Sequence, residues 1–242
     1  MSSLKSIFLA VTAVVLACGI CSAAKYQELD AEGLKRLMDK GSVLVVNPLS
    51  PIEYDVEHIV GSVNIPIENL KSVLPKDLGM PIVFYCLGEK CVYSWRAAED
   101  AAELGYKNTY TFRGGLPAWK AAGYPVESTL KLPNVAIPAI STEKLAAMLE
   151  KEDFVLLDVN SEEDVATFWI DSPKRVYIPL KDLKEKYAAI PKNKTVVVLC
   201  LKGHRSPTAA RYLALKGFKD VQIVEGGIQK WILEGRSVKK KG

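Results

Sequence analysis

A cysteine at position 200 directly follows a run of apolar and β-branched residues. The run, residues 195–199, is typical of a strand in a parallel sheet. Beyond a short polar loop, three alanines and one leucine within residues 209–214 recur with the spacing of a helix face. The pattern therefore predicts that Cys200 lies at the carboxyl end of a buried strand, beside the start of a helix.

The loop that follows Cys200 is basic and contains a glycine. The backbone N–H groups of residues 201–206 and the positive end of the next helix would stabilise an anion at the cysteine. Lys202, His204 and Arg205 would surround that anion with positive charge. The alternative interpretation is that Cys200 is a small buried apolar residue. The abrupt change from a hydrophobic run to basic residues favours a reactive thiolate.

The sequence Cys-x-x-Gly-x-Arg-Ser at residues 200–206 continues with paired alanines, Gly-Phe, Val-Glu-Gly-Gly and a tryptophan. This order resembles the active-site half of a rhodanese domain, and the likeness runs from Ile140 to about Val238. The resemblance implies a sulfurtransferase in which Cys200 carries sulfur as a persulfide. It implies a small anionic sulfur donor such as thiosulfate, and a thiol, a protein thiol or a cyanide-like molecule as acceptor. The substrate-binding residues that it implies are Leu201, Lys202, Gly203, His204, Arg205 and Ser206.

The two halves of the chain repeat each other. Ser94 matches Ser206 and Trp119 matches Trp231, each pair 112 positions apart, and several glycines and alanines keep this offset. A repeat this long is typical of a duplicated domain, and strand patterns alternating with helix patterns indicate an α/β fold. We predict two tandem rhodanese-like domains, each a central, mainly parallel sheet flanked by helices. Their expected bounds are 25–127 and 139–238, with a linker at 128–138 and a basic tail at 239–242.

The loop of the first half differs from that of the second. Cys86 ends a predicted strand eight residues before Ser94, whereas Cys200 stands six residues before its matched serine, so the first loop is two residues longer. Cys86 is a second catalytic candidate, and Lys90 and Cys91 are further substrate-binding candidates. Three interpretations remain open: a second persulfide site at Cys86, a disulfide or dithiol redox pair of Cys86 with Cys91, or a degenerate structural loop.

Other prominent residues are given structural roles. The Gly-Gly pairs at 114–115 and 226–227 are expected to form turns that need a positive φ angle, and the two matched tryptophans are expected in the core. The remaining assignments are a hydrogen-bonded structural role for His58 and bracing of the adjacent loops by Asn47 and Asp158. Arg96 and Arg211 are expected to be surface charges on helices, with contact to the substrate as the alternative.

The N-terminal residues 1–24 read as a secretory signal peptide. Lys5 precedes an apolar run at residues 7–20, and small residues at 22–24 follow it. The run is short for a transmembrane helix, which needs about 20 residues, so an exported and periplasmic protein is expected. The alternative is a lipoprotein anchored through a lipid on Cys18. A membrane is expected as a partner only in that case. The formal charge of +4 is scattered, which argues against nucleic-acid binding.

Two other functions compete with sulfur transfer. A phosphatase or an arsenate reductase also holds a thiolate in an anion cradle, but it needs an arginine at the sixth position after the cysteine, where Ser206 stands. An exported redox or sulfur-binding partner module that uses Cys86 and Cys91 is the second rival. None of these functions calls for a cofactor or a metal here, since the chain has no nucleotide-binding glycine loop and no paired-histidine metal motif.

Overall fold

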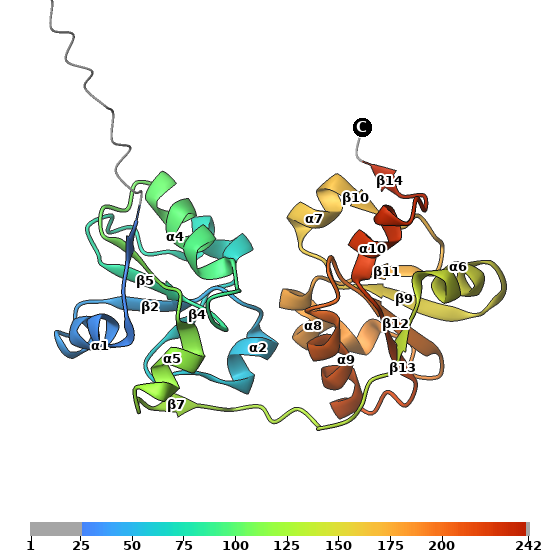
Figure 1. The fold of residues 1–242 in the computed structure, drawn as a ribbon, viewed down its shortest axis with the longest axis horizontal. Coiled ribbons are helices and arrows are strands. Elements are labelled where there is room, and N and C mark those ends of the chain that lie inside the picture. The colour runs from blue at the N-terminus through green and yellow to red at the C-terminus, as the bar shows by residue number, and fades with distance from the viewer. Residues whose placement is uncertain (1–25, 241–242) are drawn as a thin grey trace, which may run out of the picture.

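The computed structural model describes residues 26–240, which form two lobes joined by an extended segment (Figure 1). The predicted signal peptide, with Cys18, lies outside the described residues. Each lobe is built around one five-stranded sheet in which every neighbouring pair of strands is parallel. The predicted fold class is confirmed. None of the described helices is long and apolar enough to cross a membrane.

The sheets of the two lobes have the same strand order. In the first, the order is β1 (Gln27–Glu28), β6 (Thr109–Phe112), β5 (Ile82–Tyr85), β2 (Leu44–Asn47) and β4 (Val63–Asn64). In the second, it is β8 (Ala139–Ile140), β13 (Val221–Val224), β12 (Thr195–Leu199), β9 (Phe154–Asp158) and β11 (Arg175–Tyr177). Short antiparallel pairs flank them: β3 (His58–Ile59) with β7 (Val126–Glu127), and β10 (Phe168–Trp169) with β14 (Lys239–Lys240). Part of the basic tail is therefore a strand.

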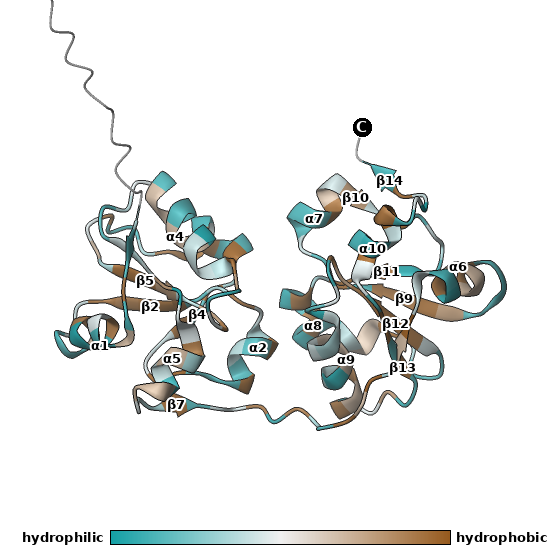
Figure 2. Ribbon diagram, in the orientation of Figure 1, coloured by the Kyte–Doolittle hydropathy of each residue, from teal (hydrophilic) through white to brown (hydrophobic). Residues whose placement is uncertain are grey.

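Helices cover both faces of each sheet. The first lobe has α1 (Ala31–Asp39), α2 (Pro51–Val56), α3 (Leu70–Val73), α4 (Tyr93–Glu103), α5 (Gly115–Ala121) and the short 3₁₀ helix Ile67–Asn69. The second has α6 (Thr142–Lys151), α7 (Glu162–Thr167), α8 (Leu180–Lys186), α9 (Ser206–Leu215), α10 (Gly227–Leu233) and the 3₁₀ helix Tyr187–Ala189. Hydrophobic residues concentrate in central strands such as β2, β5 and β9 (Figure 2).

The central strands divide their side chains between two hydrophobic layers, because successive residues of a strand point to opposite faces. In β12, Val196 and Val198 pack with α8 and α9, whereas Val197 and Leu199 pack with α6 and α10. In β5, the alternate residues pack likewise against α4 on one face and against α1 and α5 on the other. All these β12 side chains are fully buried, so the strand holds the residue that follows it in a fixed place.

The two lobes touch through α2 of the first. Ile52 of this helix is fully buried and belongs to the hydrophobic core of the second lobe. Asp55, also of α2, forms an ion pair with Lys184 of α8, and its carbonyl oxygen accepts hydrogen bonds from the amides of Thr129 and Leu130. Residues 128–138 contain no helix or strand, and their Leu130 packs against the second core, as the apolar composition of this segment indicates.

Candidate active site

Cys200 lies where the sequence predicts it, one residue after β12 and at the N-terminal end of α9. Its side chain is 1% exposed, and its Sγ lies 3.4 Å from Oγ of Ser206, the first residue of α9. A helix N-terminus carries partial positive charge from unpaired N–H groups. The position of the sulfur is therefore suited to a negative charge.

The first turn of α10 fixes the backbone of the cysteine. The amide of Ile228 donates to the carbonyl oxygen of Cys200 at 2.9 Å, and the amide of Gln229 donates to that of Leu201 at 2.9 Å. Gly227 has a φ of +63°, and a Cβ atom there would lie 2.1 Å from the Cys200 oxygen. The Gly-Gly pair is thus a turn, as expected, and it is also the surface against which the reactive loop packs. Of its counterpart in the first lobe, Gly115 has a positive φ but Gly114 does not.

The structure places Cys86 in the position that corresponds to Cys200. The amide of Leu116, which matches Ile228 at the repeat offset, donates to the Cys86 carbonyl oxygen at 3.1 Å. The sheets agree: Phe84 pairs with Thr111 as Val198 pairs with Ile223. A fixed offset of 112 residues would set Gly88 opposite Cys200. The two extra residues therefore lie in the loop after Cys86, and both cysteines end equivalent strands.

Cys86 and Cys91 interact through their side chains. Both are free thiols in this structure, and Cys86 is fully buried. A hydrogen bond from the Cys91 thiol, opposed by burial and assisted by contacts with Gly88 and Ser94, lowers the pKa of Cys86 to about 7 from an ordinary value of 9.0. The same contact and burial raise the pKa of Cys91. Near pH 7 Cys86 is therefore about half ionised, and Cys91 is the member of the pair that keeps its proton.

The hydrogen bond from Cys91 predicts how Cys86 titrates. Because Cys91→Ala removes the largest contribution that stabilises the thiolate, the pKa of Cys86 should rise from about 7 toward the ordinary value of 9.0. At pH 7 the variant would then hold much less thiolate than the parent protein. Thiolate ultraviolet absorbance against pH, taken as a difference from Cys86→Ser, measures this shift. An unchanged midpoint in Cys91→Ala would mean that other groups of the loop set the pKa.

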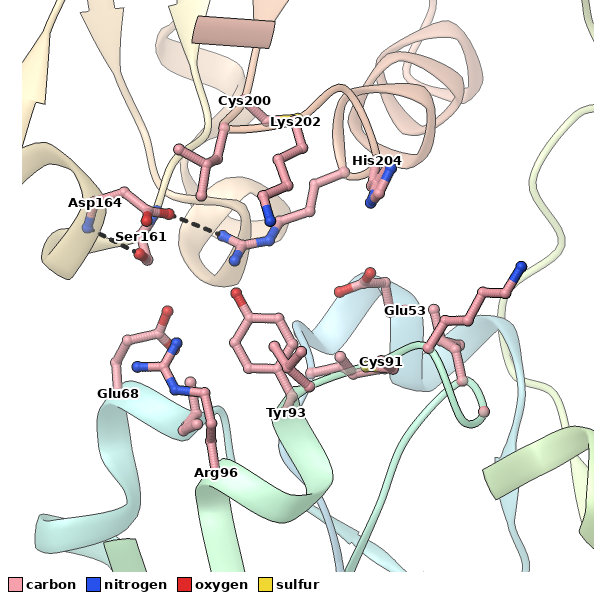
Figure 3. Close-up of a pocket in the computed structure, with 18 of the residues that line it drawn as sticks. Glu53, Glu68, Cys91, Tyr93, Arg96, Ser161, Asp164, Cys200, Lys202 and His204 are labelled. Carbon is pink, nitrogen blue, oxygen red and sulfur yellow. Dashed lines mark hydrogen bonds and ion pairs between the residues drawn. The ribbon is translucent and has the colours of Figure 1, made fainter. Parts of the chain in front are cut away.

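A cavity of about 1070 Å³ lies between the two lobes and is lined by both loops (Figure 3). Its walls include most of the residues that the sequence singles out: Lys90, Cys91, Cys200, Leu201, Lys202, His204 and Arg205. Three predicted residues do not line it. Ser206 and Cys86 are fully buried behind their loops, and Gly203 turns with a φ of +83° against Gly226. The two loops therefore face one cavity, which the sequence does not reveal.

Arg205 spans the boundary between the lobes. Its guanidinium group lies 3.7 Å from a carboxylate oxygen of Asp164 and 5.0 Å from the ring centroid of Tyr93, the first residue of α4 (Figure 3). Tyr93 thus brings the first lobe into contact with the loop of Cys200. No motif in the sequence singled out Tyr93, although it stands 112 positions before Arg205. A repeat pairs equivalent positions, but it does not predict that the two loops face each other.

Acidic residues of the cavity also escaped the sequence analysis. Glu53 and Asp164 are the third residues of α2 and α7, and each completes a capping box with the serine before its helix. Such a Ser-x-x-Glu or Ser-x-x-Asp pattern is visible in the sequence but predicts only a helix start. Glu68 also lines the cavity, and burial raises its pKa. Carboxylates from both lobes therefore face the basic loop of Cys200.

Arg96 departs from the role that the sequence analysis gave it. It was expected to be a surface charge on a helix, but it lines the cavity and its Nη2 lies 2.8 Å from a carboxylate oxygen of Glu163 in the other lobe. Arg96 is still a partly exposed charge on α4, but helix periodicity shows which face is polar, not what lies opposite that face. Among the described residues, Lys202 has no recorded carboxylate partner, so its charge remains available to a ligand.

His58, Asn47, Asp158 and the two matched tryptophans have structural roles, as expected. His58 Nδ1 donates to the Tyr54 carbonyl oxygen at 2.9 Å, and the two rings stack. Asn47 accepts a hydrogen bond from the amide of Leu49, and Asp158 accepts one from the amide of Asn160, so both brace the chain after their strands. The matched tryptophans of α5 and α10 are buried. No group of three or more metal-ligating side chains is found within residues 26–240.

The fold and the site define a known class of protein. Residues 30–122 and 141–234 match the model of the rhodanese-like domain family. The two matches together cover well over half of the chain, and the protein therefore belongs to the rhodanese-like domain family. Because the family model matches twice, this member carries two such domains in tandem.

Curated relatives match this chain over about one domain each. A putative sulfurtransferase of Bacillus subtilis, YtwF, is 39% identical over 96 residues, which are 39% of this chain and 90% of that protein. A sulfurtransferase of Allochromatium vinosum is 32% identical over 97 residues, 40% of this chain and 89% of that protein. A thiosulfate sulfurtransferase, GlpE, of Pseudomonas savastanoi is 34% identical over 87 residues, 36% of this chain and 79% of that protein. Each relative is matched along most of its own length.

Proposed function

We propose that the protein is a sulfurtransferase in which Cys200 carries sulfane sulfur between a donor such as thiosulfate and a thiophilic acceptor. The observation that carries this proposal is the position of the cysteine, at the end of β12, over the N-terminus of α9 and on the wall of a cavity. Membership of the rhodanese-like family and relatives named as sulfurtransferases support it.

The proposed reaction has two nucleophilic displacements. The Cys200 thiolate attacks the outer sulfur of thiosulfate, the S–S bond of thiosulfate breaks, and sulfite leaves with the bonding electron pair. The enzyme then holds a Cys200 persulfide, whose negative charge is stabilised by the helix end and the loop amides. An acceptor thiolate or cyanide attacks the outer sulfur and restores the Cys200 thiolate. Sulfur transfer in this form uses no metal and no organic cofactor.

The basic side chains of the loop have different tasks in this proposal. Lys202 lines the cavity and attracts the anionic donor. Arg205 is held by Asp164 and Tyr93, so its charge is oriented before the donor arrives. The cavity, of about 1070 Å³, is as large as the largest sites that usually hold drug-sized molecules, which measure about 300–1,000 Å³, whereas thiosulfate has only five atoms. The cavity therefore leaves room for a bulky acceptor, such as a low-mass thiol or the thiol of a protein segment.

The phosphatase and arsenate reductase alternative is disfavoured by the shape of the loop. Ser206, not an arginine, holds the sixth position after the cysteine, and its hydroxyl lies beside the sulfur inside the protein. The arginine of this loop, Arg205, stands one position earlier. It therefore does not occupy the place that the cradle of a tetrahedral oxyanion requires.

Thiosulfate labelling tests the proposal. Purified protein incubated with thiosulfate and freed of excess donor should carry one additional sulfur atom on Cys200, and cyanide should remove it as thiocyanate. Peptide mass spectrometry with and without cyanide measures both steps, and an arsenate or aryl phosphate assay covers the alternative reaction. Absence of the adduct on Cys200, with turnover of a phosphate ester, would refute sulfur transfer.

We further propose that the protein is exported. The support is the pattern of the N-terminal 24 residues: a lysine, an apolar run and small residues. The mass of the mature N-terminus, compared between the periplasmic and cytoplasmic fractions of a bacterial host, distinguishes cleavage near Ala24 from lipid attachment at Cys18 and from retention of the whole chain.

A further inference from the structure

The loop of the first domain places two thiols beside the cavity that Cys200 also lines, so sulfur bound in that cavity can reach them. Cys91 and Cys200 line the same cavity, from opposite lobes. Arg205, of the second loop, lies close enough to Cys91 for its positive charge to interact with a thiolate formed there. Cys86 ends the strand equivalent to that of Cys200, and Cys91 lies between it and the cavity.

The turn between the two thiols brings them together. The amide of Cys91 donates to the Gly88 carbonyl oxygen at 2.9 Å, and Gly88 has a φ of +135°, a conformation that favours glycine. This turn folds the chain back so that Sγ of Cys86 lies 3.5 Å from the carbonyl oxygen of Cys91 and contacts its thiol. The second loop, residues 201–206, contains no cysteine, so only the first loop offers a second thiol.

Few apolar contacts hold this loop against the protein. Leu87 and Val92, at its two ends, are 50% and 43% exposed. Segments with little buried apolar surface open at low free-energy cost. Opening of residues 87–92 would expose Cys86 to the cavity without disturbing the strand before it.

The different states of the two thiols suit them to consecutive steps. The hydrogen bond between them favours the thiolate of Cys86 and the protonated thiol of Cys91. A thiolate is the attacking form in sulfur exchange. Cys86 is therefore prepared to accept sulfur first. Cys91 can attack only after Sγ of Cys86 carries an outer sulfur, because only then can a hydrosulfide leave.

We propose that Cys86 and Cys91 form a second, sulfide-releasing site, in which Cys86 accepts sulfane sulfur that arrives in the shared cavity and Cys91 resolves the resulting persulfide. The inference rests on the proposed sulfurtransferase function and extends it. It gives the two domains different tasks. The loop of Cys200, residues 201–206, contains no second cysteine and passes its sulfur onward, whereas the first domain discharges sulfur as sulfide.

Sulfide release at this site takes two displacements, after which a thiol regenerates the pair. The Cys86 thiolate attacks the outer sulfur of a persulfide, the donor leaves as a thiolate, and Cys86 becomes a persulfide. Cys91 then loses its proton and attacks the inner sulfur, which is Sγ of Cys86. The bond to the outer sulfur breaks, hydrosulfide leaves with the electron pair, and a Cys86–Cys91 disulfide forms. The sulfane sulfur is reduced and the two thiols are oxidised, and two equivalents of a low-mass thiol restore the pair as that thiol becomes a disulfide.

The test uses the full chain with Cys200→Ser, so that Cys86 and Cys91 are the only loop thiols, and a small amount of glutathione persulfide as donor. The expected result is release of one equivalent of sulfide and formation of a Cys86–Cys91 disulfide. Trypsin cuts after Lys90, between the two cysteines. The disulfide therefore appears as a linked pair of peptides that separates on reduction.

Two matched variants complete the test. In Cys91→Ser with Cys200→Ser, Cys86 should keep one additional sulfur atom and sulfide release should fall to background. In Cys86→Ser with Cys200→Ser, neither a persulfide nor sulfide above background should appear. Circular dichroism spectra and thermal midpoints check that all three proteins are folded.

The outcomes separate this inference from the proposed function. If Cys86 keeps its additional sulfur even when Cys91 is present, or if Cys86 takes up no sulfur, the sulfide-releasing site does not exist. A parent protein that still forms the cyanide-sensitive adduct on Cys200 would retain the proposed function in either case. Loss of that adduct alone, with the linked peptides still formed from glutathione persulfide, would overturn the proposed function and leave the second site intact.

Discussion

Replacing Cys200 by serine is expected to lower the rate of thiosulfate:cyanide sulfur transfer by at least about 10³-fold, because loss of a covalent nucleophile removes both displacement steps. Serine differs from cysteine by one atom, so the fully buried side chain keeps its shape and its contact with Ser206. The thermal midpoint should therefore change little. Steady-state thiocyanate formation, measured beside thermal unfolding, separates lost chemistry from lost structure.

A smaller loss of sulfur-transfer rate in Cys200→Ser would point to a second sulfur carrier in the first domain. If a substantial fraction of the transfer rate survives, the first domain supports turnover by itself, through the equivalent strand end at Cys86. The double variant Cys86→Ser with Cys200→Ser then has to abolish the remainder. Activity that persists in the double variant would exclude both cysteines as the sulfur carrier.

Gly227→Ala is expected to be the most damaging single change outside the cysteines. The added Cβ would lie 2.1 Å from the Cys200 carbonyl oxygen and 2.7 Å from that of Leu201, at a φ of +63°. The start of α10 must then move away, which breaks the hydrogen bonds from Ile228 and Gln229. We expect a loss of about 2–4 kcal/mol in the free energy of unfolding. Sulfur transfer should fall as well, since the reactive loop loses its support.

Gly235→Ala is the matched control for this prediction. Gly235 also has a positive φ, of +75°, but a Cβ there meets no atom within 4 Å. Only the backbone conformation is penalised, by about 1 kcal/mol, and transfer activity should be retained. Urea unfolding of the two variants compares them directly. Equal losses of stability would mean that the positive φ, and not the close approach to Cys200, explains the effect at Gly227.

The two cysteine loops differ in length, so a constant repeat offset does not align their cysteines. A constant repeat offset aligns the serines and the last helices but sets Gly88 opposite Cys200. The structure restores Cys86 to that position, because sheet hydrogen bonds and the contact with Leu116 fix the strand end whatever the loop length. Loops tolerate insertions, whereas the register of a buried strand does not.

What the sequence determined by itself was local or repetitive. Alternation of apolar strands and helices predicted two α/β domains. The change from an apolar run to Lys202, Gly203, His204 and Arg205 placed Cys200 at a strand end, beside a helix start. These features depend on neighbouring residues and on hydrophobic periodicity, which a sequence displays directly.

Only the tertiary structure decided what lies opposite each loop. Tyr93 and Arg96 of the first domain reach the second through Arg205 and Glu163, and both loops open on one cavity. This arrangement depends on how α2 packs against α8, with Ile52 buried in the core of the other domain. Contacts between residues far apart in the chain follow from the packing of whole domains. Spacing and residue type along one chain carry no record of that packing.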